Sequence, residues 1–204
     1  MPVLVTDPDL EDRLKRQRQL SGGDRFDEVW EGVYMMAPLA DNEHQSLAGR
    51  LTGALQAVLG WSSAAKVLPG ANISDREQAW EENYRCPDVV VVLPGTKAID
   101  RGTHWFGGPD FAIEILSPYD RSREKFPFYA SVGVRELLLV DRYPWKLELH
   151  GLDAGQLLLK GTSTLTQPDS LSSAVLPLSF RQLAGKPRPQ IEIQHHDGQQ
   201  RWLA

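Results

Sequence analysis

The stretch that decides the fold runs from residue 110 to residue 141 and reads DFAIEILSPYDRSREKFPFYASVGVRELLLVD. Its apolar run at residues 111–116 predicts a strand, and residues 136–141 predict a second one. A helix is expected between them, capped at Asp120 or Ser122 and closed by a glycine. Strand, helix and strand in this order predict a crossover unit and therefore an α/β fold with a mixed sheet.

A second apolar run upstream carries a carboxylate, as the first one does. Residues 86–93 read CPDVVVVL, which predicts a strand covered on both sides, with Asp88 at its start. Glu114 lies in the middle of the run at 111–116. A carboxylate in such a place is costly unless a cation lies beside it. If the two runs pair as neighbouring strands, Asp88 and Glu114 form a pair of hard oxygen ligands that suits Mg²⁺.

The remaining pattern predicts a single folded domain with short appendages. Residues 1–22 are expected to form an N-terminal helix begun by Asp7 and Pro8, residues 23–185 the domain, and residues 186–204 a C-terminal hairpin. Within the domain we expect a hairpin over 25–36 turning at Glu31-Gly32, a helix from an Asp41 or Asn42 cap to Gly60, strands at 64–68, 146–150 and 156–160, a polar connection at 69–82 and a loop at 95–109.

Composition narrows the class of protein. The 204 residues are 41% hydrophobic, enough for one core, and the formal net charge of −5 argues against a generally basic nucleic-acid-binding surface. Cys86 is the one cysteine, so an internal disulfide and a cysteine-based zinc site are excluded. The sequence shows neither a membrane-spanning run nor the features of a signal peptide, and we expect a cytoplasmic protein.

The candidate site for phosphodiester chemistry draws on five segments. Asp88 and Glu114 would hold the metal, and the main-chain carbonyl of Ile115 could complete its oxygen shell. Lys125 could approach from the helix that follows, and Glu31 from the first hairpin. The side chains expected around this set are His44, which would steer substrate or water, and Gln45, Ser117 and Asp120.

Each of these residues also has an ordinary structural interpretation. Asp88 could cap its strand, and Glu114 could form a salt bridge with a nearby arginine or with Lys125. Lys125 and Glu31 could be solvated surface charges, and His44 could hydrogen-bond the first turn of its helix. The residues alone leave these alternatives open.

An ordered series of short motifs links the chain to a known family. The strings are residues 28–38 (EVWEGVYMMAP), His44-Gln45, Pro87-Asp88-Val89, residues 114–118 (EILSP), Lys125, residues 129–134 (YASVGV) and residues 139–141 (LVD). In this order, over about residues 20 to 185, the chain resembles the Uma2 family of "putative restriction endonucleases", which belongs to the PD-(D/E)XK nuclease-like superfamily.

The resemblance implies a restriction-endonuclease-like α/β/α sandwich and metal-dependent cleavage of DNA, with Mg²⁺ or Mn²⁺ as cofactor. Asp88 matches the aspartate of the superfamily motif and Glu114 its (D/E) position. The superfamily lysine would fall two residues later, where this chain has Leu116. Lys125 matches the lysine usual in the family at that point of the following helix.

Three functions follow as hypotheses. The leading one is a metal-dependent endonuclease acting on DNA, and the alternative from another class is a nuclease-like fold kept as a non-catalytic binding or assembly module. A hydrolase of RNA or of another phosphodiester is the third. Cleavage of both strands of a duplex would need two such sites, which predicts a homodimer.

Overall fold

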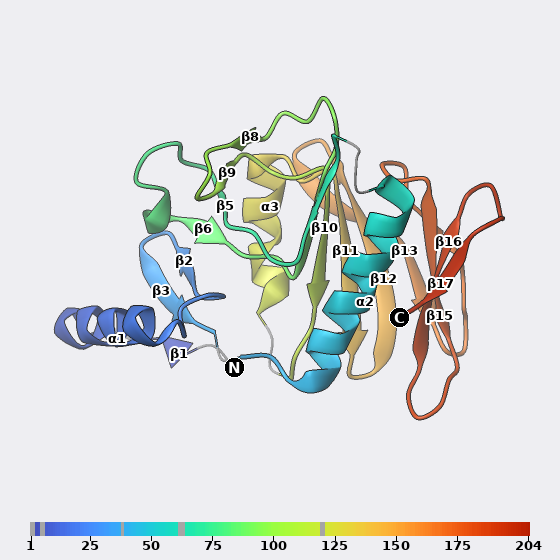
Figure 1. The fold of residues 1–204 in the computed structure, drawn as a ribbon, viewed down its shortest axis with the longest axis horizontal. Coiled ribbons are helices and arrows are strands. Elements are labelled where there is room, and N and C mark those ends of the chain that lie inside the picture. The colour runs from blue at the N-terminus through green and yellow to red at the C-terminus, as the bar shows by residue number, and fades with distance from the viewer. Residues whose placement is uncertain (1–2, 5–6, 38, 61–63, 119–120) are drawn as a thin grey trace.

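The structure is a computed structural model that describes residues 3–4, 7–37, 39–60, 64–118 and 121–204. Its centre is a six-stranded sheet in the order β13-β12-β11-β10-β7-β4 (Figure 1). The bounds of these strands are β4 Lys66–Leu68, β7 Val89–Val92, β10 Phe111–Ile115, β11 Glu136–Arg142, β12 Trp145–Asp153 and β13 Gln156–Thr164.

The crossover predicted from residues 110–141 is confirmed. Strands β10 and β11 are parallel, with Phe111 opposite Glu136 and Ile115 opposite Val140. All other pairings in this sheet are antiparallel, so the sheet is mixed. The helix α3 (Phe126–Val132) connects the two parallel strands and ends at Gly133, which has a left-handed φ of 88°.

The start of this connection differs from the prediction. Residues Ser122–Lys125 form a 3₁₀ turn, η2, and Arg121 precedes it without a side-chain capping bond among the described residues. Ser122 is therefore not the cap, and Asp120 lies outside the described residues. Pro127 has no N–H to donate to the carbonyl four residues back, so the regular α-helical ladder begins only at Phe126.

Two helices cover opposite sides of the central sheet. The helix α2 (Asn42–Leu59) packs Leu47, Leu51 and Leu55 on one side, in a cluster that also holds Ile113 of β10. On the other side, α3 packs Phe128 and Tyr129 against Ala112. Side chains of β10 thus alternate between α2 and α3, as expected for a strand buried on both sides.

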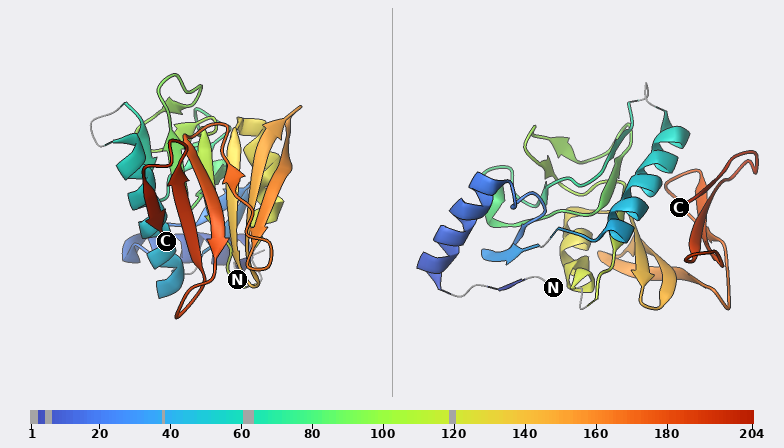
Figure 2. Two further views of the ribbon diagram at one scale, coloured as in Figure 1. Left: turned by 90° about the vertical axis from the view of Figure 1, so that its right-hand side faces the viewer. Right: turned by 60° about the horizontal axis from the view of Figure 1, so that its bottom comes forward.

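Two further sheets flank this centre. A seven-stranded sheet in the order β1-β3-β2-β6-β5-β9-β8 joins β1 Val3–Leu4, β2 Glu28–Trp30, β3 Val33–Met36, β5 Ile73–Ser74, β6 Tyr84–Arg85, β8 Ile99–Asp100 and β9 Trp105–Phe106. A four-stranded sheet in the order β14-β15-β16-β17 joins β14 Leu171–Ser172, β15 Leu178–Leu183, β16 Gln190–His195 and β17 Arg201–Leu203. The four-stranded sheet and the helix α1 (Pro8–Ser21) lie at opposite ends of the molecule (Figures 1 and 2).

Most local predictions agree with these elements. Asp7 caps α1, Asp41 rather than Asn42 caps α2, and the first hairpin turns at Glu31-Gly32. The segments 69–82 and 95–109 are not plain connections, because they contain β5, β8, β9 and the 3₁₀ turn η1 (Trp80–Glu82). Strands of two residues show no periodicity and form only when tertiary pairing brings them together.

The C-terminal hairpin is present but packs within the molecule. Strands β16 and β17 pair antiparallel, and β16 also pairs with β15. Ile191 and Ile193 of β16 are fully buried in the cluster that contains α2. The division of the chain after residues 22 and 185 stays a prediction.

Candidate active site

The two carboxylates of the motif lie at the same end of neighbouring strands. Strand β7 pairs antiparallel with β10, and Ile113 lies opposite Val89. Glu114 and Asp88 come next along each strand, so alternation directs both side chains toward the α3 side of the sheet. The prediction that these two segments pair is confirmed.

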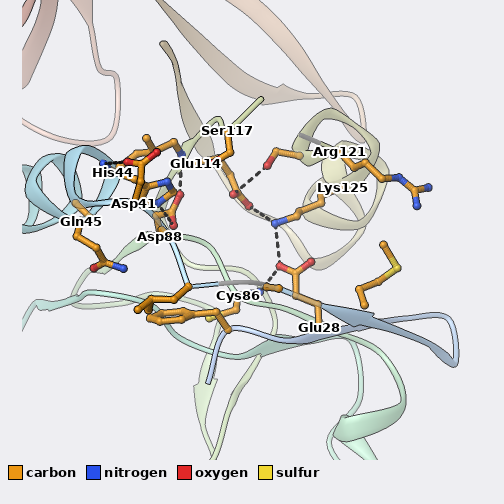
Figure 3. A pocket seen from close by; sticks show the side chains of 18 of the residues that line it. Glu28, Asp41, His44, Gln45, Cys86, Asp88, Glu114, Ser117, Arg121 and Lys125 are labelled. Carbon is orange, nitrogen blue, oxygen red and sulfur yellow. Dashed lines mark hydrogen bonds and ion pairs between the residues drawn. The ribbon is translucent and has the colours of Figure 1, made fainter. Parts of the chain in front are cut away.

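Both carboxylates line one pocket of about 540 Å³. Its wall combines the N-terminus of α2, the first hairpin, the ends of β7 and β10, and η2 (Figure 3). The predicted residues that line it are His44, Gln45, Asp88, Glu114, Ile115, Ser117 and Lys125.

Glu114 is the most buried acid of this pocket, at 3% exposure. Its Oε1 accepts hydrogen bonds from Lys125 Nζ at 3.0 Å and from the Tyr129 hydroxyl, and its Oε2 accepts one from Ser122 at 3.3 Å. Burial raises the pKa of Glu114 to about 7, against the attraction of Lys125. The charge of Asp88 adds to this rise, which reflects how near the two carboxylates are.

Lys125 bridges two acids within the pocket. Its Nζ donates to Glu28 Oε1 at 2.8 Å and to Glu114 Oε1 at 3.0 Å (Figure 3). Burial alone would lower the pKa of this ammonium, but the two carboxylates outweigh burial and hold it above its usual value. Lys125 is therefore a buried, permanently charged cation and not the exposed helix lysine of its ordinary interpretation.

Glu28 supplies the carboxylate that was expected from Glu31. Glu28 Oε1 accepts a bond from the Cys86 amide at 2.8 Å and Oε2 accepts one from Trp30 Nε1 at 2.6 Å, besides the bond to Lys125. Glu31 is exposed at the hairpin turn, with φ 51°, and it lies outside the described lining of the pocket. Its predicted place in the site is wrong.

The sequence held a signal for this exchange. Glu31, directly before Gly32, belongs to the turn, and side chains in such a turn point to solvent. A glutamate within the strand can point into the molecule. Glu28 precedes Val29 and Trp30 in a strand-like run, as Glu114 lies within one.

Asp88 is held by a backbone amide and a histidine. Its Oδ2 accepts from the amide of Ile115 at 2.7 Å, and its Oδ1 lies 2.7 Å from His44 Nε2. Burial lowers the pKa of His44. The hydrogen bond to Asp88 and the negative charge of Asp88 raise this pKa by more than burial lowers it, so the net shift is upward. His44 therefore lies directly beside Asp88, and the steering of substrate or water that was predicted for it stays a prediction.

Arg142 was not among the predicted residues, although it fixes the geometry of the site. Its fully buried guanidinium donates to the Leu116 carbonyl at 3.1 Å, to Asp41 Oδ1 at 2.9 Å and to Glu43 Oε2 at 3.1 Å. These bonds tie the N-terminus of α2 to the end of β10. An arginine after an apolar strand gives no sequence signal for such a role.

The donor set suits a hard divalent cation. The acids that line the pocket, Glu28, Asp41, Asp88 and Glu114, outnumber the cations Lys125 and Arg121, so the pocket carries excess negative charge. In the described parts of the chain, histidine, cysteine, aspartate and glutamate side chains do not gather in threes or more as a metal-binding group. A metal would thus depend on two carboxylates, a main-chain carbonyl and water, a combination that Mg²⁺ accepts.

Comparison with known proteins places this architecture. The sequence model of the Uma2 family, described as "Putative restriction endonuclease", matches residues 12–184. A solved structure described as "a putative nuclease belonging to DUF820" from Anabaena variabilis ATCC 29413 superposes with a TM-score of 0.56 at 16% identity, covering 72% of this chain and 80% of that one. A search of curated proteins found no match.

The structural likeness supports a restriction-endonuclease-like fold, with α2 and α3 on the two sides of a mixed sheet. The described helices include none that is long and apolar enough to span a bilayer.

The family model extends over most of the chain, from residue 12 to residue 184. The chain therefore belongs to the Uma2 family of nuclease-like proteins.

Proposed function

We propose that this protein is a divalent-metal-dependent nuclease that hydrolyses phosphodiester bonds in DNA. The observation that carries the proposal is the meeting of Asp88, Glu114 and Lys125 in one pocket, from two paired strands and the connection that follows them. The membership of a nuclease-like family supports the reaction class.

Asp88, Glu114 and the carbonyl of Ile115 would hold Mg²⁺ or Mn²⁺. When bound, the ion would supply charge stabilisation to the phosphate and a lowered pKa to a coordinated water. The amide of Ile115 and His44 fix the Asp88 carboxylate from two directions, so it is oriented before a ligand arrives.

Lys125 would stabilise the negative charge that develops on the phosphate. It would take the part of the superfamily's strand lysine, because position 116 is a leucine and Lys125 reaches the pocket from η2. The Lys125 ammonium donates to Glu28 Oε1 at 2.8 Å, and this contact limits how far the ammonium can reach into the pocket. His44 would orient water or substrate beside Asp88.

Plasmid DNA and RNA incubated with Mg²⁺ or Mn²⁺ would test this function. We expect DNA cleavage that chelation abolishes and that D88N and E114Q reduce by at least about a hundredfold, the scale of losing one major electrostatic contribution. D153N is a matched control, because Asp153 is exposed on the distant hairpin of β12 and β13. Cleavage by E114Q at the wild-type rate would contradict the assignment, and cleavage of RNA alone would exclude DNA as the substrate.

A non-catalytic binding or assembly module is the second candidate. It is favoured because the polar groups of the site already have partners within the chain: Lys125 is paired with two acids, and both oxygens of Asp88 are in contact with a hydrogen-bonding nitrogen. Isothermal calorimetry separates the two functions. A nuclease should bind Mn²⁺ in a way that D88A and E114A abolish, whereas an assembly module need not bind a metal.

A homodimer stays part of the proposal only for cleavage of both strands, which would need two sites related by a two-fold axis. Gel filtration with light scattering tests it. A monomer under conditions that support double-strand cutting would contradict it.

A further inference from the structure

The pocket has two walls of different chemistry. One wall carries Asp88, Glu114 and Lys125. The other is largely apolar, with Phe26, Trp30, Met35 and Leu39, and holds Glu28, whose carboxylate accepts a hydrogen bond from Trp30 and which lies opposite Met35. Leu39 is 79% exposed, so this wall is open to a ligand. The phosphate and sugar groups of a nucleic acid are polar and gain little from contact with such a wall. Base faces would fit it, but in an intact duplex these faces are stacked on one another, and only an unstacked base presents one.

A second pocket of about 270 Å³ adjoins the first. The residues shared by both pockets are Phe26, Pro69 and Cys86, so these residues lie between the two. The second pocket is lined by the polar side chains of Arg25, Asn72, Asp100, Thr103 and His104. Asp100 already accepts from Lys66 at 2.7 Å and His104 contacts the Arg76 carbonyl at 3.1 Å, whereas Arg25 is exposed. Such groups can read the edge of a base that has left its stack.

Phe26 lies between the two pockets, and its ring is packed against a glycine. Gly70, at φ 78°, packs against it, and a Cβ added at Gly70 would lie 3.3 Å from Phe26 Cε1. The guanidinium carbon of Arg25 lies over this ring, 5.8 Å from its centroid, and Arg25 is exposed, so its cation is available to a backbone phosphate next to the ring. This combination of an aromatic platform and a neighbouring cation is typical of single-strand binding.

The net charge of the molecule also favours a single strand over a duplex. Duplex binding takes most of its affinity from many phosphate contacts, and this chain has a net charge of −5. The two cations that line the first pocket are already paired, Lys125 with two glutamates and Arg121 with Glu124 at 2.8 Å. Stacking can replace part of the missing electrostatic attraction.

We propose that the substrate is a single strand of DNA that passes from one pocket to the other, with one base stacked on Phe26 and the next base held in the second pocket. This inference rests on the proposed nuclease function, because the scissile phosphate is placed beside Asp88 and Glu114. It adds the substrate class, unpaired DNA, and a residue that determines it.

Fluorescence anisotropy tests the substrate class in the full-length protein, with calcium in place of magnesium and a gel to verify that the probe stays intact. The probes are a labelled oligothymidylate, the same strand annealed to its complement, and the corresponding oligouridylate. We expect the single strand of DNA to bind at least about tenfold more tightly than the duplex.

Substitutions at Phe26 test the platform. F26L keeps an apolar side chain but removes the aromatic face, so it should weaken binding of the single strand about tenfold, and F26W should retain it. W202L, in β17 of the distant four-stranded sheet, is the matched control for loss of an aromatic ring. Circular dichroism melts verify that each variant is folded.

The outcomes separate this inference from the proposed function. Duplex binding as tight as single-strand binding, tighter binding of oligouridylate, or no effect of F26L would each overturn the inference even if DNA is cleaved. Binding of the single strand that depends on Phe26, without cleavage of any nucleic acid in Mg²⁺ or Mn²⁺, would support the binding path and refute the nuclease function.

Discussion

At the scale of single residues, the site is a balance of buried charges. Glu28, Lys125 and Glu114 form a chain in which each charge is compensated by its neighbour, at 2.8 and 3.0 Å. Removing one member of such a group leaves the others buried without compensation, which costs more than the intact pairs contribute. The residues that serve the proposed chemistry thus also constrain the fold.

The substitution K125M tests this coupling. We expect a loss of about 3–5 kcal/mol in the free energy of unfolding, because Glu28 and Glu114 would remain buried without their cation. The double variant E28Q/K125M should regain part of it, since one of the two stranded carboxylates becomes neutral. Urea denaturation of the single and double variants measures both values. Equal stability of K125M and the wild type would show that the cation is not needed to bury these acids.

The same scale explains which site residues could be found from the sequence. Asp88 and Glu114 could be predicted because a carboxylate in a valine- and isoleucine-rich run is physically unusual. Arg142 could not, because its partner Asp41 lies far along the chain. For Glu28, the strand-like run 28–30 indicates a buried carboxylate but not its distant partner, Lys125. Glu28 and Glu31 lie three residues apart, and only Glu28 belongs to the strand, which decides which of the two carboxylates reaches the pocket.

At the scale of elements, the site is held by the ends of secondary structures. The connection into β10 passes closely over the C-terminus of α3, where the Gly108 amide neighbours the turn at Gly133, and Gly108 donates to the Val132 carbonyl at 2.6 Å. A Cβ built on Gly108 would lie 2.5 Å from the amide nitrogen of Val134. Both contacts are with backbone, so the approach requires a glycine.

The substitution G108A should therefore destabilise the protein by about 1–3 kcal/mol, the range for inserting an atom into a packed site. G53A is its matched control, because Gly53 is exposed within α2 and a Cβ there meets nothing within 4 Å. The control should gain about 0.5–1 kcal/mol from helix propensity. Thermal melts of both variants give the two signs, and a stabilising G108A would contradict the close packing of β10 and α3.

At the scale of the whole molecule, one hydrophobic cluster joins α2, the central sheet and the four-stranded sheet. The C-terminal residues complete it, because Ile191 and Ile193 pack with Phe180, whose ring stacks on Phe111 at 5.7 Å. The predicted appendage at 186–204 therefore shares a core with the strand that carries Glu114.

Truncation after Gly185 should strongly destabilise the protein, because it removes both buried isoleucines and leaves Phe180 open to water. Each lost isoleucine alone is expected to cost about 2–5 kcal/mol. The midpoint of thermal unfolding and the soluble yield of residues 1–185 measure the effect. A truncated chain with the melting temperature of the full chain would mean that residues 186–204 form an independent extension.

The sequence by itself determined the class of fold, the crossover between β10 and β11, the cap of α1 and the positions of Asp88 and Glu114, and it narrowed the cap of α2 to Asp41 or Asn42, because periodicity and end signals act over a few residues. Only the tertiary structure decided that Glu28 and not Glu31 reaches the pocket, that Arg142 ties α2 to β10, and that Phe26 separates two pockets. These contacts join residues that are tens of positions apart, and the free energy of such contacts depends on burial and distance, which no local pattern encodes.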